Sequence, residues 1–137
     1  IFKDIDEIAI NYFRKTPSIE IPGGNLLVEN CVFYNVYNAE KGKIIRTNGI
    51  HKVVIRNSVF DNSYRIKNFI DLKGSENIIE NCLVHDSGFI KGSKNALEKN
   101  ILFKSPKWDE KSTFTPSKKS PLLKSKNKKA TIGLIKK

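Results

Sequence analysis

The sequence predicts an all-β fold, a right-handed parallel β-helix of about five coils with an irregular C-terminal capping tail. Three observations predict it. Short apolar segments centred on Asn recur between residues 8 and 103, a second set of β-branched segments lies between them, and Gly-containing turns follow that second set. Short β-branched runs that are interrupted by Gly or Asn favour strands over helices.

The first repeated element is an apolar run, an Asn and a further apolar run. It occupies residues 27–33, 54–60, 78–84 and 97–103, and residues 8–13 form a weaker copy. The Asn residues of this series are Asn11, Asn30, Asn57, Asn81 and Asn100. Stacked coils would place their amides above one another at a buried bend, where they bond each other and the turn backbone. The alternative is that Asn is common in this sequence and in turns generally.

The second repeated element is a short β-branched segment between successive Asn-centred runs. Residues 44–46, 69–71 and 89–91 align with each other, and residues 19–21 are a candidate earlier member. Turn residues follow these segments, as in Asn48-Gly49, because Gly supplies the positive φ that a tight turn requires. One unit is therefore a strand, a turn, a strand and a turn, and its strands pair with those of the units above and below.

The same alignment predicts columns of equivalent side chains. One column is apolar and a second apolar column lies beside it, and strand alternation means that the two need not face the same side. A third column is outward and of mixed charge. The three columns are Phe33, Phe60, Val84 and Phe103; Val32, Val59, Leu83 and Leu102; and Glu29, Arg56, Glu80 and Lys99.

The two cysteines test this alignment. Cys31 and Cys82 occupy one column with Ser58 between them, so they lie two coils apart. Two steps of ~4.8 Å place them on the order of 10 Å apart, whereas a disulfide needs Cα atoms closer than about 7 Å. The alignment predicts two free, buried thiols.

The chain divides into coils at residues 1–103 and a capping segment with a basic tail at residues 104–137. The tail has eleven Lys against Asp109 and Glu110, a net charge of +9 out of the total of +11. An open solenoid end needs a cover, and the aromatic and aliphatic residues of the tail suit that role: Trp108, Phe114, Leu122 and Leu123. The alternative for Trp108 is a platform on which a sugar stacks. The chain starts at Ile1 and has no Met, which favours a mature piece or the C-terminal part of a longer chain.

The segments VENCVF (residues 28–33), VIRNSVF (54–60) and IENCLV (79–84) resemble the coils of the pectate-lyase-like parallel β-helix superfamily. The ending FTPSKKSPLL with ATIG (114–123 and 130–133) is similar to the C-terminal cap of many bacterial members. Among these, the chain most resembles polysaccharide lyase family 6, which includes chondroitinase B and alginate lyases, and related bacterial β-helix domains. The shared motifs are structural, so they specify fold more strongly than activity.

This resemblance implies a protein that is secreted, periplasmic or on the cell surface and that acts on or binds an acidic polysaccharide. Family 6 lyases remove the proton beside a uronate carboxylate with a Lys or Arg base, often with Ca²⁺ neutralising that carboxylate. The family's calcium-binding cluster and Lys-bearing catalytic stretch have no match in this sequence. The catalytic residues therefore stay unknown, Ca²⁺ enters only through the resemblance, and the alternative is a non-catalytic carbohydrate-binding or surface-display solenoid.

Charged residues at equivalent positions of the repeat predict a binding surface. Arg46, Asp71 and Lys91 fall at equivalent positions of the second element, where two cations and a carboxylate could hold uronate groups by charge-assisted hydrogen bonds. Arg65 and Lys67, in the loop between coils, are further candidate sugar contacts. The alternative for the Arg46 column is an ion-pair ladder that keeps the face soluble.

Other classes are disfavoured by the sequence. His51 and His85 lack partners at metal-ligand spacing, so no metal site is expected. No apolar run approaches the ~18–20 residues of a membrane span. No phosphate-binding Gly-rich loop or nucleophile motif is present. The basic tail lacks interleaved aromatic residues, so nucleic acid is not the expected partner.

Overall fold

Parallel pairing between strands of successive sequence repeats builds the structure, a computed structural model that describes residues 1–6, 8–13, 24–36, 43–63, 70–88, 96–110 and 112–124. Strands and one 3₁₀ helix are its regular elements, and the described residues include no α-helix. The elements are β1 (Phe2–Ile5), β2 (Ile10–Phe13), β3 (Asn25–Glu29), β4 (Val32–Val36), β5 (Ile45–Arg56), β6 (Val59–Asp61), β7 (Ile70–Glu80), β8 (Leu83–His85), β9 (Ala96–Lys99), β10 (Leu102–Phe103), β11 (Trp108–Asp109), β12 (Ser112–Pro116) and η1 (Pro121–Lys124). The predicted all-β class is confirmed.

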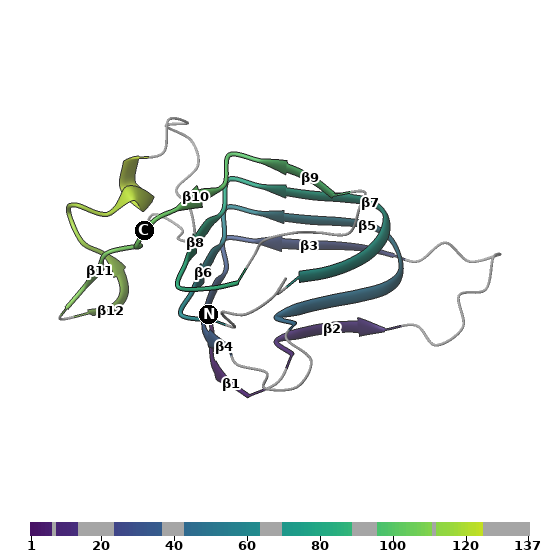
Figure 1. Cartoon of the computed structure of the whole chain (residues 1–137), viewed down its shortest axis with the longest axis horizontal. Helices are drawn as coiled ribbons and strands as arrows, with labels where there is room; N and C mark the ends of the chain where they lie inside the picture. The colour runs from purple at the N-terminus through teal and green to yellow at the C-terminus, as the bar shows by residue number, and fades with distance from the viewer. Residues whose placement is uncertain are drawn as a thin grey trace.

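The first parallel sheet, sheet A, has the strand order β1-β4-β6-β8-β10. Each strand pairs in parallel with the equivalent strand of the next repeat, so equivalent residues of successive repeats lie side by side (Figure 1). Phe33 lies opposite Phe60, Phe60 opposite Val84, and Val84 opposite Phe103. The predicted alignment of this apolar column is therefore confirmed.

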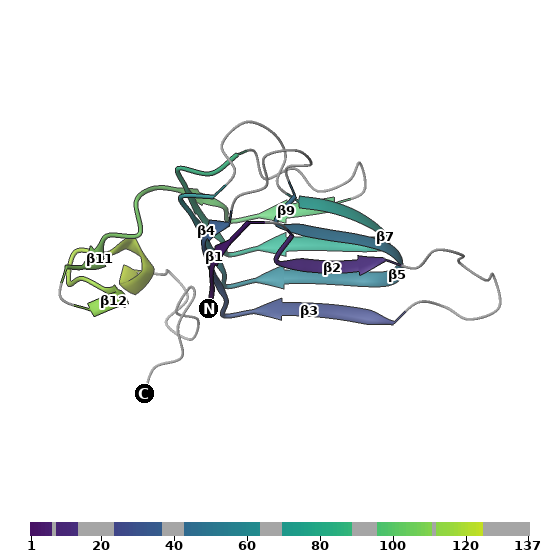
Figure 2. The same ribbon diagram turned by 90° about the horizontal axis from the view of Figure 1, so that it is seen from below.

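The second parallel sheet, sheet B, has the order β2-β5-β7-β9, with β3 also pairing with β5. The first half of β5 pairs with β2, as at Ile10 opposite Ile45, and its second half pairs with β3, as at Val28 opposite Ile55. Strand β7 follows β5 along both halves (Figure 2). The predicted alignment of residues 44–46 with residues 69–71 is confirmed, since Arg46 lies opposite Asp71.

The expected turn between the two elements of a repeat is absent from β5 and β7. Each is one long strand, of 12 and 11 residues, that runs through the predicted turn positions. Gly49, with a φ of 72°, lies where the register between β5 and β7 shifts by one residue. It therefore acts as a bulge, which bends a strand without ending its pairing.

The recurring Asn residues lie at the corner that joins sheet B to sheet A. Asn30, Asn57, Asn81 and Asn100 have φ values of 55°, 51°, 51° and 53°, and each stands between two strands. Asn is one of the few L-residues that tolerates this left-handed conformation. Backbone pairing continues through the corner, because the Asn57 amide donates to the Glu80 carbonyl oxygen at 3.2 Å and the Asn81 amide to that of Lys99 at 3.0 Å. The predicted bonding between stacked amides is confirmed for one pair, since Asn100 Nδ2 donates to Asn81 Oδ1 at 3.1 Å, but this pair is exposed and not at a buried bend. The backbone conformation that all four share explains the recurrence of Asn.

Asn11 does not belong to this series, and its assignment to it was wrong. It lies within β2, opposite Arg46 of β5, and not at a corner. The first repeat instead begins with β1, where Phe2 lies opposite Phe33. The apolar run of residues 8–13 resembled the other copies in composition, but it pairs with the second element of the next repeat.

A second column of Asx residues lies at the other end of the sheet A strands. Asp4, Asn35, Asn62 and Asp86 have φ values of 52°, 52°, 48° and 44°. The Asn35 amide donates from Nδ2 to Oδ1 of Asp4 at 2.8 Å, and this bond lowers the pKa of the Asp4 carboxyl group. Strands β6 and β8 therefore lie between two left-handed Asx residues, whereas in β4 the second one, Asn35, is the last residue but one of the strand.

Ser and Cys residues follow several of these corners and satisfy their backbone. The Ser58 hydroxyl donates to the Arg56 carbonyl oxygen at 2.9 Å and accepts from the Cys31 amide at 3.2 Å. The Ser63 hydroxyl makes the same pair of bonds with the Asp61 carbonyl oxygen and the Val36 amide, at 3.0 and 3.1 Å. These hydroxyl groups are buried, so their bonds supply the partners that buried polar groups require.

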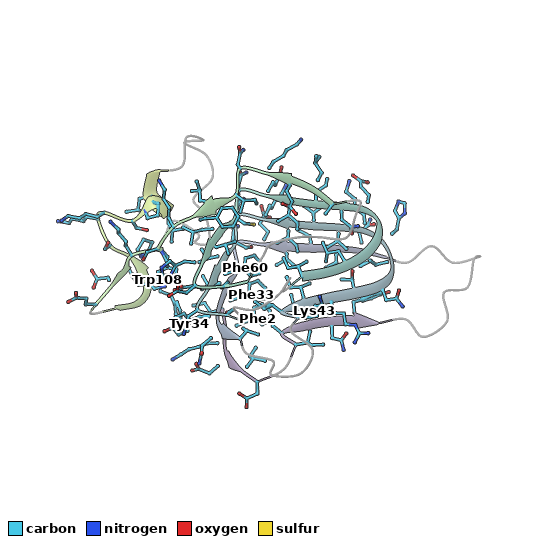
Figure 3. The ribbon with its side chains drawn as sticks, in the orientation of Figure 1. Phe2, Phe33, Tyr34, Lys43, Phe60 and Trp108 are labelled. Carbon is cyan, nitrogen blue, oxygen red and sulfur yellow. The ribbon has the colours of Figure 1, made fainter. Side chains whose placement is uncertain are left out.

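The apolar side chains of the two sheets form the core between them. Phe2, Phe33 and Phe60 stack with ring centroids 4.8 and 4.9 Å apart and nearly parallel planes (Figure 3). Phe33 and Phe60 are fully buried and pack with Ile45, Ile55 and other buried residues of sheet B. The neighbouring column, which includes Val32, Val59 and Leu83, forms a separate cluster on the outer side of sheet A. The predicted alternation of the two apolar columns is thus confirmed.

The C-terminal segment covers this outer side. Phe114 of β12 and Leu122 of η1 are buried against Val32, Val59 and Leu83. Figure 2 shows β11, β12 and η1 beside sheet A, on the side away from sheet B. The expectation that Phe114 and Leu122 cover the open end of the stack was wrong, because the outward apolar column of sheet A needs the same cover. Leu123 is exposed, and Phe103 on β10 is 66% exposed.

Candidate functional site

The predicted sugar-binding column is described in part. Arg46 on β5 lies opposite Asp71 on β7 in the register of sheet B, so their backbones are neighbours. Asn11 on β2 lies opposite Arg46 on the other side. The remaining candidates, Lys91, Arg65 and Lys67, lie outside the described residues.

Arg46 points away from the core. Its neighbours Ile45 and Thr47 are fully buried and point inward, and Arg46 between them is partly exposed. Asn48, two residues further along, is partly exposed as well. Because strand side chains alternate, Arg46 and Asn48 share the outer face of the first half of β5. This face can offer a guanidinium group and an amide to a ligand that lies along the sheet.

A second polar cluster was not predicted from the sequence. Asp61, at the end of β6, is buried, with 5% of its surface exposed. Its Oδ1 lies 2.8 Å from Nδ1 of His85 on β8, and its Oδ2 accepts a hydrogen bond from Nε1 of Trp108 at 2.7 Å. One buried carboxylate thus connects sheet A to the first strand of the C-terminal segment.

The chemistry of Asp61 fixes the orientation of the His85 ring. A carboxylate only accepts hydrogen bonds, so Nδ1 of His85 carries the proton that is shared with Oδ1. In the neutral imidazole, Nε2 is then the basic nitrogen. The His85 side chain is 34% exposed. A histidine held in this way can accept a proton from a group that approaches from solvent.

Aromatic residues surround the carboxylate. Tyr34 lies opposite Asp61 in the register of sheet A. The rings of Tyr34 and Trp108 both meet the Phe114 ring edge to face, at centroid distances of 5.3 and 5.5 Å. Figure 3 shows Tyr34 and Trp108 on the side of sheet A that faces the C-terminal segment. Trp108 therefore anchors this segment through its indole N–H and ring, and its ring edge is committed to Phe114.

A sequence signal for this cluster exists. Tyr34, Asp61 and His85 occupy the position directly before the second Asx corner in three successive repeats. This column can be recognised in the sequence once it is known that each short strand of sheet A ends near an Asx residue. The bond to Trp108 spans 47 residues and leaves no local pattern, so the sequence could not reveal it.

The outward charged column of sheet B follows the predicted order. Glu29 lies opposite Arg56, Arg56 opposite Glu80, and Glu80 opposite Lys99. The Arg56 Nε atom is 2.8 Å from Glu29 Oε1, and this hydrogen bond and the Glu29 charge raise the pKa of Arg56. Lys52 forms a similar pair with Glu76 at 2.8 Å. These pairs are exposed to solvent, where water and salt screen the charges, so they contribute little to stability.

The cysteines are free, as predicted. Cys82 is fully buried, and desolvation raises its pKa to about 12. Desolvation also raises the pKa of Cys31, but this residue is partly exposed, so the prediction that both thiols are buried was wrong for Cys31. Both thiols donate to the carbonyl oxygen two residues earlier, at 3.3 Å, as the corner Ser residues do. They are structural members of the corner columns.

Among the described residues, no group of three or more His, Cys, Asp or Glu side chains lies close enough to hold a metal ion. No helix among these residues is long and apolar enough to cross a membrane. Comparisons of the chain with protein-family models, with curated proteins and with solved structures give no match.

Proposed function

We propose that the chain is a right-handed parallel β-helix that binds an acidic polysaccharide along the outer face of sheet B. Three features support the fold. Both sheets are parallel, their strands stack in repeat order, and left-handed Asx corners separate the short strands of sheet A from their neighbours. The resemblance of the Asn-centred segments to the pectate-lyase-like superfamily agrees with this arrangement.

The outward position of Arg46 carries the ligand proposal. A guanidinium group binds a carboxylate through two parallel hydrogen bonds, and uronate residues present one carboxylate per sugar. Arg46 lies opposite Asn11 of β2, about 4.8 Å away, so a chain lying across these two strands meets a polar side chain on each. A ligand of this kind agrees with a secreted, periplasmic or cell-surface protein.

Binding without turnover is the better-supported form of this proposal at the Arg46 face. A guanidinium group presents N–H donors in a planar fork and has no acceptor, so it is suited to holding a carboxylate and not to removing a proton. Arg46 therefore suits a carboxylate clamp and does not suit a base. The second candidate is a lyase that removes the uronate proton at a separate site, on the side of sheet A that faces the C-terminal segment. The His85–Asp61 pair favours it, since it supplies an oriented imidazole there.

The test is titration calorimetry of the chain with alginate, pectate and chondroitin oligosaccharides at low salt. We expect binding to one of these ligands and its loss in Arg46→Ala. The matched control is Lys52→Ala, which removes an outward cation from the other half of the same strand. Binding that Lys52→Ala weakens equally would reflect net charge alone. The absence of binding to any acidic glycan would overturn the proposal.

Turnover is followed separately, by the ultraviolet absorbance of unsaturated uronates in the same mixtures. Binding with no rise in absorbance identifies a binding module. A rise that His85→Gln abolishes, while calorimetric binding persists, identifies a lyase in which His85 removes the proton.

A further inference from the structure

The outer face of the second half of sheet B carries a stripe of aliphatic side chains. Four residues, one from each of β3, β5, β7 and β9, lie directly opposite one another in register and point away from the core. They are Leu27, Val54, Ile78 and Leu97, and together they are called the outer stripe. Leu27 and Leu97 are 54% and 49% exposed, whereas their neighbour Val28 is 3% exposed and packs in the core. An apolar column in solvent calls for a partner surface.

Charged side chains border the outer stripe on both sides. On one side are Glu29, Arg56, Glu80 and Lys99, so the sign alternates from strand to strand. On the other side, Lys52 of β5 lies opposite Glu76 of β7. These two columns stand two residues from the stripe on either side, so all three share the outer face.

The charges select one way for this face to meet a copy of itself. A two-fold axis along the strands, midway between β5 and β7, brings β3 over β9 of the other copy and β5 over β7. Arg56 then faces Glu80, Lys52 faces Glu76 and Glu29 faces Lys99, each from opposite copies. A two-fold axis along the stack would instead bring Arg56 over Lys52 and Glu80 over Glu76, which are like charges and cost free energy.

The first arrangement also matches the outer stripe with itself. Leu27 meets Leu97 of the other copy, and Val54 meets Ile78. An isologous contact of this kind closes as a dimer and does not propagate. We propose that the outer face of the second half of sheet B binds the same face of a second copy of this chain, about a two-fold axis parallel to its strands. This contact is independent of the polysaccharide proposal, which uses the first half of the sheet.

The size of the face sets the strength of the contact. Four strands of five residues cover about 19 Å by 16 Å, or roughly 300 Å² per copy. A stable interface of standard size buries about 800 Å² per partner. The dimer is therefore weak and reversible, with the outer stripe supplying most of its free energy and the charges supplying its orientation.

Sedimentation equilibrium from about 10 µM to 1 mM protein tests the contact. We expect a monomer–dimer equilibrium for the wild type and a monomer at every concentration for Leu97→Asp. The control is Leu123→Asp, since Leu123 is equally exposed at 51% but lies in η1, away from sheet B. Circular dichroism checks that both variants are folded, and Leu27→Asp repeats the test at the opposite strand. A wild type that stays monomeric, or a Leu123→Asp effect equal to that of Leu97→Asp, would overturn the proposal.

A charge-inverted chain tests the orientation. It combines Glu29→Arg, Arg56→Glu, Glu80→Arg and Lys99→Glu, so the signs still alternate within the chain. We expect it to dimerise with itself as the wild type does, because inversion preserves self-complementarity. A dimer of one wild-type and one inverted copy faces like charges at all four positions, so fluorescence energy transfer between labelled wild-type and inverted chains should be lost. Transfer as strong as between two wild-type chains would refute this two-fold arrangement.

Discussion

The left-handed corner at Asn57 gives a direct test of how the repeats turn. Asn57 has a φ of 51°, and its side chain is almost buried, with 9% of the residue exposed. Its Oδ1 is buried and has no hydrogen-bond partner among the described residues, and its Nδ2 lies 3.5 Å from Glu29 Oε1. The Asn57 side chain thus contributes little bonding, and the backbone conformation explains the choice of residue. We therefore predict that Asn57→Gly is more stable than Asn57→Ala.

The magnitudes follow from the backbone. A left-handed conformation costs an ordinary L-residue about 1–2 kcal/mol, and Gly does not incur this cost. Gly loses about 0.5–1 kcal/mol more conformational entropy on folding than Ala does. Removal of an unpaired buried acceptor offsets part of that loss in both variants. Asn57→Gly should therefore stay within about 1 kcal/mol of the wild type and be more stable than Asn57→Ala, which should lose about 1–2 kcal/mol.

Urea unfolding followed by circular dichroism measures both free energies. The control pair is Asn25→Gly and Asn25→Ala, because Asn25 is exposed and lies within β3. In a strand, Gly is the less stable of the two by about 0.5–1 kcal/mol, so the order should reverse. If Asn57→Ala is as stable as Asn57→Gly, the left-handed backbone does not explain why Asn recurs at the corners, and our account of the repeat is wrong.

Two further predictions concern the buried side chains. At pH 8 in the native protein, Cys82 should stay unlabelled by a thiol reagent over the time in which Cys31 begins to react. The reason is that a pKa of about 12 leaves roughly one Cys82 side chain in ten thousand as the thiolate. Mass spectrometry locates the label, and both thiols should react in urea. Rapid labelling of native Cys82 would contradict its burial. Asp61→Ala should destabilise the chain by about 1–3 kcal/mol, since His85 and Trp108 both lose the carboxylate to which they are bonded. Its Trp108 fluorescence should shift to the red as the indole gains water, and an unshifted spectrum would show that Asp61 does not hold the C-terminal segment.

Much of the strand register could be predicted because each repeat aligns its own residues with those of the next. The alignment of Phe33 with Phe60, and of Glu29 with Arg56, required only that equivalent positions stack. A period of two along a strand then separates inward from outward columns. The free state of Cys31 and Cys82 followed from the same register. Repetition makes each copy a check on the others, which a single strand would not provide.

The errors have a common physical origin, which is that composition does not identify backbone conformation. Residues 8–13 look like an Asn-centred run, yet Asn11 lies in an extended strand. Asn48-Gly49 looks like a turn that ends a strand, yet Gly49 lies within β5 as a bulge. Only φ separates these cases, since Asn and Gly are both compatible with turns, corners and bulges.

Contacts between segments far apart in the sequence could not be predicted, for a different reason. The bond from Trp108 to Asp61, like the packing of Phe114 on Val59, depends on which surface the C-terminal segment covers. Two surfaces offered apolar residues to it, the open end of the stack and the outer side of sheet A. The periodic pattern predicts both surfaces and does not rank them.

The surface that the C-terminal segment covers bears on the dimer proposal. Sheets A and B each present an outward aliphatic column, and the segment at residues 105–124 covers the one on sheet A. In sheet A, the covered column includes Val32, Val59 and Leu83 and is buried, whereas in sheet B the terminal members of the outer stripe are about half exposed. Both columns arise from the same alternation, so the same physical reasoning that explains the cover on sheet A applies to sheet B. The cover on sheet B is then supplied by a second molecule. If the outer stripe were instead only a consequence of β-propensity, Leu97→Asp would leave the oligomeric state and the solubility of the chain unchanged.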